Sequence, residues 1–314
     1  MSMSLLNRSR VRGDFFLRYA QVAAGLRLDR MAMMTQSDAA SERYGFVGGP
    51  SAPRKRTGPK TVPGVVGQKI DVVNEPWYQG FSVDRLDAKR DQTGSFQRRS
   101  QQLGAAFAEF KLKLLTDLLQ NAALKSYDGQ TFFDTDHEVE ASGAQKNLLT
   151  SAEVTELNVA DAQNPTPEEA AVFLAALASY TLRYKGAGGE PMHGIPTQFL
   201  AMVPANMGRG VNVAVSANSL GLAANTILGL RDSGRMVIDA IVNPRLTIGA
   251  DLYLFVLDGA APAFIIQEEE PTWFQYWDEE SDHYKDMDEF KVVANWTGGS
   301  AGGEPLSVIK ATLS

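Results

Sequence analysis

The chain has 314 residues, of which 44% are hydrophobic and 21% charged, and its formal net charge is −7. This is an ordinary globular composition, and the length allows two domains. The absence of cysteine excludes disulfides, thiolate zinc sites and cysteine nucleophiles. No apolar run reaches the roughly 18 residues of a membrane span. The first residues lack the apolar core and cleavage site of a signal peptide, so we expect an intracellular chain.

The charge is distributed unevenly. Residues 1–60 hold 11 of the 30 Lys and Arg but 4 of the 37 Asp and Glu, for a net charge of +7, and the remainder carries −14. An acidic body with a basic arm is not the pattern of a protein that reads nucleic-acid sequence. It favours an arm that docks on acidic neighbours, because opposite fields promote association.

The basic arm comprises residues 1–46, and its pattern predicts a short amphipathic helix over residues 14–28. Arginine dominates its charge, at Arg8, Arg10, Arg12, Arg18, Arg27 and Arg30. Two interpretations remain open for this arm: a frayed terminus, or a segment that becomes ordered only against a partner subunit.

Residues 45–63 are rich in Gly, Pro and basic side chains, and they lack the GxxxxGK[ST] pattern of a phosphate-binding loop. Residues 69–87 then alternate apolar and polar side chains in two runs around Asn74-Glu75-Pro76, which predicts a hairpin at a sheet edge. We expect residues 47–90 to form an excursion without a core of its own, which something outside the monomer must stabilise.

The stretch 93–121 predicts a helix that would be roughly 40 Å long, at 1.5 Å per residue. Its apolar residues recur at spacings of 7, 4, 3, 4 and 4 and form one stripe, at Phe96, Leu103, Phe107, Phe110, Leu114 and Leu118. A helix of this length in a globular chain is typical of a structural spine.

The sequence YDGQTFFDTDHE at residues 127–138 predicts a tight Asp-Gly turn that leads into a strand. Its cluster of Asp134, Asp136, His137 and Glu138 allows a metal site or a hydrolytic site as one interpretation. The other interpretation is a structural turn with solvated carboxylates, since no second histidine lies at ligand spacing.

Residues 166–169 carry the signals of a helix start: Thr166 as cap, Pro167 in the first turn and Glu169 as the reciprocal capping acid. The Gly-rich segment 185–189 is predicted to be a loop. Apolar runs predict further strands at residues 199–204, 211–215, 236–242 and 252–257. Together these elements predict a mixed α/β domain over residues 151–258.

The C-terminal part predicts strands at residues 263–267, 290–296 and 306–311, with a loop at 297–305. Residues 268–289 contain 10 acidic side chains among five aromatic ones. Paired carboxylates near aromatic rings can catalyse sugar hydrolysis, but a dense acidic run is more typical of a solvated or interface surface.

Several local strings resemble the Mu-like major head subunits of tailed phages. The most specific is YDGQxFFDxxH over residues 127–137, and the resemblance extends over residues 40–296. It is also carried by the segments 44–48, 117–120, 186–189, 196–197, 203–204, 262–267 and 286–290.

The resemblance implies an α+β chain with the HK97-type capsid fold. It implies an N-terminal arm at 1–46, an extended E-loop at 47–92 and a P-domain spine helix and turn at 93–150. An A-domain would follow at 151–258, and P-domain return strands with the C-terminus at 259–314.

The function implied is that of a structural subunit without a cofactor, which assembles as hexamers and pentamers into an icosahedral head around double-stranded DNA. A scaffold protein, a portal, a maturation protease and decoration proteins are the implied partners, and a membrane is not. The alternatives are an encapsulin-like compartment and, less favoured, a hydrolase.

From the residue pattern we expect assembly contacts at Arg8, Arg10, Arg12, Arg18, Lys55, Lys60, Lys69, Trp77, Tyr78, Phe81, Glu268, Glu269 and Glu270. We expect structural roles for Phe107, Phe110, Leu114, Tyr127, Gly129, Phe133 and His137.

Overall fold

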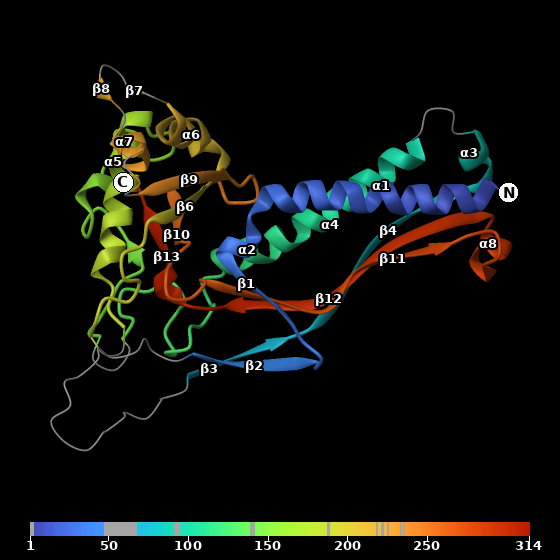
Figure 1. Cartoon of the computed structure of the whole chain (residues 1–314), viewed down its shortest axis with the longest axis horizontal. Helices are drawn as coiled ribbons and strands as arrows, with labels where there is room; N and C mark the ends of the chain where they lie inside the picture. Colours follow the sequence, from blue (N-terminus) through green and yellow to red (C-terminus); the bar gives the residue numbers. More distant parts are fainter. Residues whose placement is uncertain are drawn as a thin grey trace.

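The chain forms an elongated arm joined to a thicker block (Figure 1). The computed structural model describes residues 3–46, 68–90, 95–138, 142–186, 189–217, 219–220, 223–224, 226–232, 234 and 236–314. The described helices are α1 (Met3–Leu26), α2 (Leu28–Met31), α3 (Arg85–Arg90), α4 (Ser95–Gln120), α5 (Pro167–Tyr180), α6 (Gly208–Ser216), α7 (Thr226–Asp232) and α8 (Asp282–Met287).

A long four-stranded sheet runs along the arm, and its strand order is β1-β11-β12-β4. Its strands are β1 (Ala32–Gln36), β11 (Phe264–Trp277), β12 (Glu289–Gly302) and β4 (Glu75–Asp84). β1 is parallel to β11, and the other two pairs are antiparallel. The helices α1 and α4 lie along this sheet (Figure 1).

The predicted spine helix is confirmed as α4, and its apolar stripe faces the sheet and α1. Leu103, Phe107 and Leu114 are buried. The Phe110 ring lies between two tryptophans of the sheet, 4.9 Å from Trp77 and 5.9 Å from Trp296 between ring centroids. The stripe therefore joins the helix to the sheet, as its spacing predicts.

The N-terminal residues form one long helix that packs on α4 of the same chain. Helix α1 begins well before the predicted residue 14, and Phe15 on it is fully buried. The Phe15 ring lies 6.2 Å from Phe107 of α4 and 5.3 Å from Phe274 of β11. The Ser100 hydroxyl donates to the Val11 carbonyl oxygen at 2.7 Å. The interpretation of residues 3–46 as a frayed terminus is therefore wrong, because the hydrophobic side of α1 is buried inside its own chain.

The predicted hairpin at 69–87 is wrong in its pairing, although both strands exist. Strand β3 (Gln68–Val73) pairs with β2 (Ser41–Phe46), whereas β4 pairs with β12. Asn74 sits at the turn between the two strands, where its amide donates to the Ala39 carbonyl at 2.7 Å. The edge position of β4 is confirmed, and it tolerates Pro76 because the outer side of an edge strand needs no ladder donor. Much of the Gly/Pro-rich loop, residues 47–67, lies outside the described residues.

The thicker block holds a five-stranded sheet with the order β5-β13-β10-β6-β9. Its strands are β5 (Leu148–Leu149), β13 (Val308–Thr312), β10 (Asp251–Val256), β6 (Gln198–Val203) and β9 (Val237–Val242). After their first residues, Asp251 and Gln198, the strands β10 and β6 are buried because both faces of the sheet are covered. Leu252 and Leu254 pack toward α5 and α6, whereas Tyr253 and Phe255 pack toward the core that contains α4. The strands predicted at 199–204, 236–242 and 252–257 are confirmed.

The strand predicted at 211–215 is wrong, since these residues lie in α6. Alternating valines favour a strand locally, but Val211 and Ala214 are three residues apart on the buried side of a helix. Gly210 permits this packing: a Cβ there would lie 2.2 Å from the Pro165 carbonyl oxygen. A minor two-stranded pair, β7 (Ser219–Leu220) with β8 (Ala223–Ala224), follows α6.

The loop predicted at 297–305 is wrong for its first six residues, because β12 continues to Gly302. Gly298 and Gly299 belong to a closely packed part of the sheet. A Cβ on Gly298 would lie 2.3 Å from the Gln267 carbonyl oxygen, and a Cβ on Gly299 would lie 2.2 Å from the Val73 carbonyl oxygen. The final strand β13 is confirmed, but it pairs with β10 and β5. Residues 308–312 therefore belong to the sheet of the block. They do not lie with the return strands of the arm, where the division at residue 259 placed them.

Among the described residues, none of the helices combines the length and the hydrophobicity that crossing a membrane requires.

Gly104 marks the closest approach of α1 to α4, since a Cβ there would lie 2.4 Å from the Phe15 carbonyl oxygen. We predict that Gly104→Ala lowers the free energy of unfolding by about 1–3 kcal/mol, because the helices must separate. Gly13→Ala is the matched control: nothing lies within 4 Å of its Cβ, and alanine favours a helix by about 1 kcal/mol. Urea unfolding measures both variants. Equal effects would contradict the packing of α1 described above.

Candidate functional site

The motif at 127–137 forms a buried polar cluster where the two sheets meet. Gly129 has φ = 84°, a left-handed conformation that favours glycine, and it closes the predicted turn. Within residues 131–138 only Thr131 and His137 form isolated bridges, so the strand predicted after the turn is wrong. The turn returns Asp128 to His137, whose Nδ1 lies 2.6 Å from the Asp128 Oδ2.

Glu304 completes this cluster from the segment that connects β12 to β13. The Tyr127 hydroxyl lies 3.0 Å and 2.9 Å from the two carboxylate oxygens of Glu304, and it donates to them. The two residues are 177 positions apart in the chain. The contact therefore fixes the motif to the point where the chain passes from the arm sheet to the block sheet.

Asn147 supplies the neutral part of the cluster, and it is fully buried. Its amide nitrogen donates to the carbonyl oxygens of Phe132 and Pro305, both at 2.8 Å. Its amide oxygen accepts from the Asp134 backbone N–H at 2.9 Å. One side chain thus satisfies three buried backbone groups, each of which would otherwise cost about 1–3 kcal/mol.

Burial and charge set the ionisation of the cluster. Burial raises the pKa of Glu304 to about 7, and the hydrogen bonds from Tyr127 and the Leu306 N–H offset only part of this effect. Burial also lowers the pKa of His137, but the hydrogen bond and charge of Asp128 outweigh it, so the net shift is upward. Burial raises the pKa of Asp128, but the hydrogen bond and charge of His137 help to hold this pKa below its usual value.

The cluster is closed to a substrate. The side chains of His137 and Asp128 are 1% and 4% exposed, and Glu304 is 6% exposed. A general acid or base must reach the proton it transfers, so this arrangement supports a structural role.

The acidic side chains of the proposed metal or hydrolytic site do not converge on His137. Asp134 accepts from the Thr131 hydroxyl at 2.5 Å, and Asp136 and Glu138 are exposed. Within the described ranges, no group of three His, Asp or Glu side chains is arranged to hold a metal ion.

The three aromatic residues expected at an assembly contact lie on different faces of β4. Trp77 packs on Phe110, and Phe81 packs on Phe96 with 5.6 Å between ring centroids, so both face α4 of their own chain. Tyr78 points to the other face and is 79% exposed. Of the three, Tyr78 is the one that a neighbouring subunit can contact in full.

The three glutamates of the acidic run also differ. Glu268 lies inside the arm, where its Oε1 is 2.9 Å from Lys111 Nζ and accepts from the Trp296 indole N–H at 2.6 Å. It is therefore an internal partner rather than an assembly contact. Glu269 and Glu270 are exposed.

The basic residues expected at an interface are exposed wherever their side chains are described. Arg12 lies over the Phe16 ring at 5.7 Å, and Arg10 donates to the Gln97 side chain at 2.8 Å. Arg18 and Lys69 are also exposed. Lys55 and Lys60 lie outside the described residues, as does the side chain of Arg8.

Comparison with known proteins gives two consistent results, the first from sequence. Residues 14–166 match the family described as Mu-like prophage major head subunit gpT. The Mu-like prophage FluMu major head subunit of Haemophilus influenzae is 30% identical over 128 residues, 40% of this chain and 41% of that protein. The major capsid protein of Escherichia phage Mu is 26% identical over 112 residues, 35% of this chain and 37% of that protein. The matched segment thus spans less than half of each relative.

The second result comes from solved structures. The procapsid of bacteriophage JBD30 aligns with 100% of this chain and 77% of its own, with a TM-score of 0.54 and 17% identity. The capsid of Ralstonia phage GP4 covers 90% of this chain and 86% of its own, with a TM-score of 0.56 and 12% identity. A virus-like particle from Pyrococcus furiosus covers 96% and 98%, with a TM-score of 0.56 and 10% identity.

The chain has the HK97-type capsid fold and resembles the Mu-like major head subunits. The fold implied by the YDGQxFFDxxH resemblance is thereby confirmed.

Sequence reasoning missed Glu304 and Asn147, although both hold the capsid fold together at the cluster. Neither residue lies in a recognisable motif, and their main partners are far away in the chain. Phe132 rather than Phe133 is the fully buried aromatic of the motif, since it is 1% exposed and packs 5.0 Å from Phe264.

Glu304→Gln tests the ionisation of the cluster. Because burial raises the pKa of folded Glu304 to about 7, above the roughly 4.3 of an unfolded glutamate, its stabilising contribution is fully present below the unfolded pKa and is lost as the pH rises through the folded pKa. We predict that the unfolding free energy of the native chain falls by about 3 kcal/mol between pH 5 and pH 9. The glutamine variant, which keeps a hydrogen-bond acceptor for Tyr127, should show a smaller fall. Urea titrations across this range measure the effect, and parallel pH profiles for the two proteins would contradict it.

Proposed function

We propose that this chain is the major capsid protein of a tailed double-stranded DNA phage. It assembles as hexamers and pentamers into an icosahedral head that encloses the genome. The observation that carries the proposal is the capsid fold over the full chain, combined with the family match over residues 14–166.

The division of the fold into capsid parts belongs to the proposal. Residues 1–46 are the N-terminal arm, 47–92 the E-loop and 93–150 the spine helix and turn of the P-domain. Residues 151–258 form the A-domain, and 259–307 return to the P-domain. The pairing of β13 with β10 supports placing residues 308–314 in the A-domain.

The exposed features of the arm suit repeated contacts between subunits. Strand β4 offers an open edge and the exposed ring of Tyr78. Each exposed charge pair contributes at most about 1 kcal/mol, but a closed shell repeats every contact many times, and linked contacts gain avidity. A single subunit interface can therefore be weak while the shell is stable.

The proposal includes partners and a location. A scaffold protein guides assembly, a portal occupies one vertex, a maturation protease acts on the precursor shell, and decoration proteins bind the outside. The DNA is enclosed without sequence specificity, since the acidic body of the chain, −14 beyond residue 60, disfavours tight binding to phosphates. Assembly takes place in the bacterial cytoplasm, and the product is the virion capsid. Catalysis is not part of the proposed role.

A second candidate is an encapsulin-like shell that holds a cargo protein. Its support is the likeness to the virus-like particle from Pyrococcus furiosus, which is as close in fold as the phage capsids. The sequence relatives favour the phage head, because both curated proteins are phage or prophage head proteins.

The test is the size, symmetry and content of the assembled protein. We predict that the chain, produced with its neighbouring genes, forms closed shells with five-fold and six-fold clusters in electron microscopy. Light scattering should show a single large species, and nuclease-protected double-stranded DNA should co-purify with filled shells. Shells that contain protein cargo and no DNA would favour the compartment. A monodisperse monomer or dimer under all assembly conditions would contradict both candidates.

A further inference from the structure

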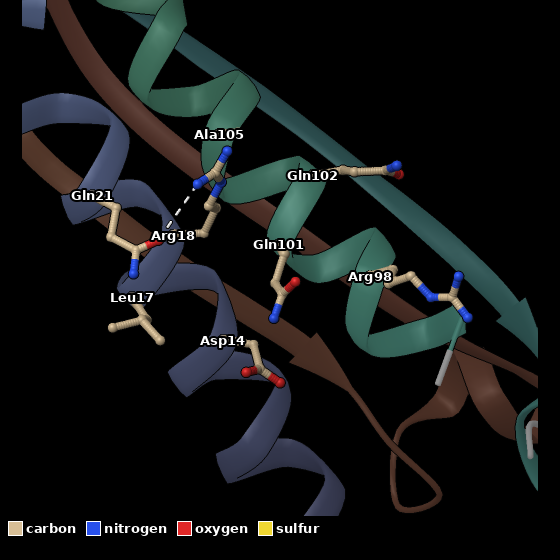
Figure 2. Close-up of a pocket in the computed structure, with 8 residues that line it drawn as sticks. All are labelled: Asp14, Leu17, Arg18, Gln21, Arg98, Gln101, Gln102 and Ala105. Atoms are coloured by element: carbon tan, nitrogen blue, oxygen red, sulfur yellow. Dashed lines mark hydrogen bonds between the residues drawn. The ribbon is translucent and has the colours of Figure 1, made fainter. Parts of the chain in front are cut away.

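A polar groove runs between the two helices of the arm, with a volume of about 480 Å³. Asp14, Arg18 and Gln21 of α1 and Arg98 and Gln101 of α4 line it. Figure 2 shows Arg18 reaching toward Ala105 of α4 and Gln101 pointing toward α1, while Arg98 extends away from α1. Guanidinium groups next to carboxamides are strong hydrogen-bond donors to carboxylates. The chemistry of the groove therefore suits an acidic peptide segment.

One acidic side chain, that of Asp14, lies among the basic and amide side chains of the groove. The Oδ2 atom of Asp14 is buried, and it has no hydrogen-bond partner among the described residues. Because this oxygen is covered by its own chain, it offers no contact point to an incoming side chain. The occupant is therefore selected by the arginines and carboxamides of the groove.

The chain itself contains such a segment, at the tip of the arm. Residues 278–289 hold seven Asp and Glu against one lysine, Lys285. The Asp282 side chain is 99% exposed and lies 3.6 Å from Lys285 Nζ, and that of Asp288 is 67% exposed and lies 3.3 Å from Arg85 Nε. Helix α8, at the centre of this tip, exposes Asp282, Lys285 and Asp286.

The tip of one chain does not reach its own groove. It is held at the end of the strands β11 and β12, and in Figure 1 the sheet lies between α8 and the helices α1 and α4. A groove and a tip at different places on one subunit make a heterologous contact, in which each copy gives one surface and receives the other. Contacts of this type close into rings or continue as open chains.

We propose that the α1–α4 groove of one subunit binds the acidic tip, residues 278–289, of a second copy of this chain. Arg18 and Arg98, which line the groove, contact the tip carboxylates. The inference rests on the proposed function, since it names the surfaces through which subunits of the capsid recognise each other. Because opposite charges steer encounter, assembly through this contact is fast at low salt and slows as salt screens it.

The absence of cysteine from the native chain makes a disulfide test specific. The variant Gln101→Cys with Asp282→Cys places one thiol in the groove and one on the tip. After oxidation of assembled particles, we expect covalent oligomers larger than dimers on a non-reducing gel, and their loss on reduction. Each single variant should give dimers at most. The control pair Val172→Cys with Asp282→Cys moves the first thiol to an exposed site on α5 and should give no such series.

Charge exchange identifies the occupant independently of disulfide geometry. Arg18→Glu with Arg98→Glu should slow assembly by about tenfold or more at low salt, whereas Arg183→Glu, an exposed arginine on the block, should not. Circular dichroism checks that each variant is folded. Adding subunits with Asp282→Arg and Asp286→Arg to the groove variant should restore assembly.

The outcomes separate the two proposals. If the native chain forms no shells, the proposed function fails. If shells form, but the covalent series is absent and the groove variant assembles normally, the inference is overturned. It is also overturned if the groove variant fails to assemble and the exchanged tip does not restore it, since the groove would then bind a different acidic partner.

Discussion

The contact on which the arm depends is the insertion of Phe15 between the spine helix and the sheet. This one side chain touches Phe107 on α4 and Phe274 on β11, and the missing side chain of Gly104 lets the α1 backbone approach closely enough. A helix pair packed on one face of a sheet forms a two-layer structure with a continuous core. Without α1, the apolar side of α4 that faces it would lie in water. The N-terminal segment is therefore packed as part of the folded chain, and its arginines Arg10, Arg12 and Arg18 are exposed.

A second constraint acts where the chain leaves the arm for the block. The segment after β12 crosses between the sheets, and Tyr127, Asn147 and Glu304 bind its backbone and side chains to the loop that follows α4. Each of these groups is buried, so each must be hydrogen-bonded, and few other arrangements satisfy all of them. Such a junction favours one relative position of the two sheets. In the proposed shell of identical subunits, a fixed angle between the two sheets keeps the contact surfaces of each subunit in the same relative position.

The sequence predicts the features that depend on neighbouring residues. The stripe of α4 and the capping box at Thr166 and Glu169 lie within one helix, and both are confirmed, the latter with reciprocal hydrogen bonds. Features that depend on distant residues were missed. The strands around Asn74 have the pattern of a hairpin, but the choice between pairing with each other and pairing with β2 and β12 is made by the rest of the fold. Val211–Val215 alternates like a strand, but these residues lie in α6, which packs closely against Pro165. Gly298 and Gly299 lie in β12, where the backbone oxygens of Gln267 and Val73 approach them too closely for a Cβ. Glu268 is indistinguishable in sequence from Glu269 and Glu270; its contacts with Lys111 and Trp296 separate its role.

The central physical claim is that α1 belongs to the folded subunit before any assembly occurs. Hydrogen exchange of the backbone amides of residues 11–19, measured on unassembled protein and on assembled shells, tests it most directly. The account predicts strong protection of this segment in the unassembled subunit, similar to that of residues 103–115 of α4, with little further gain in the shell. Exchange at the rate of an unfolded peptide in the unassembled subunit, with protection only after assembly, would contradict it and would make the N-terminal segment an arm ordered by its partners.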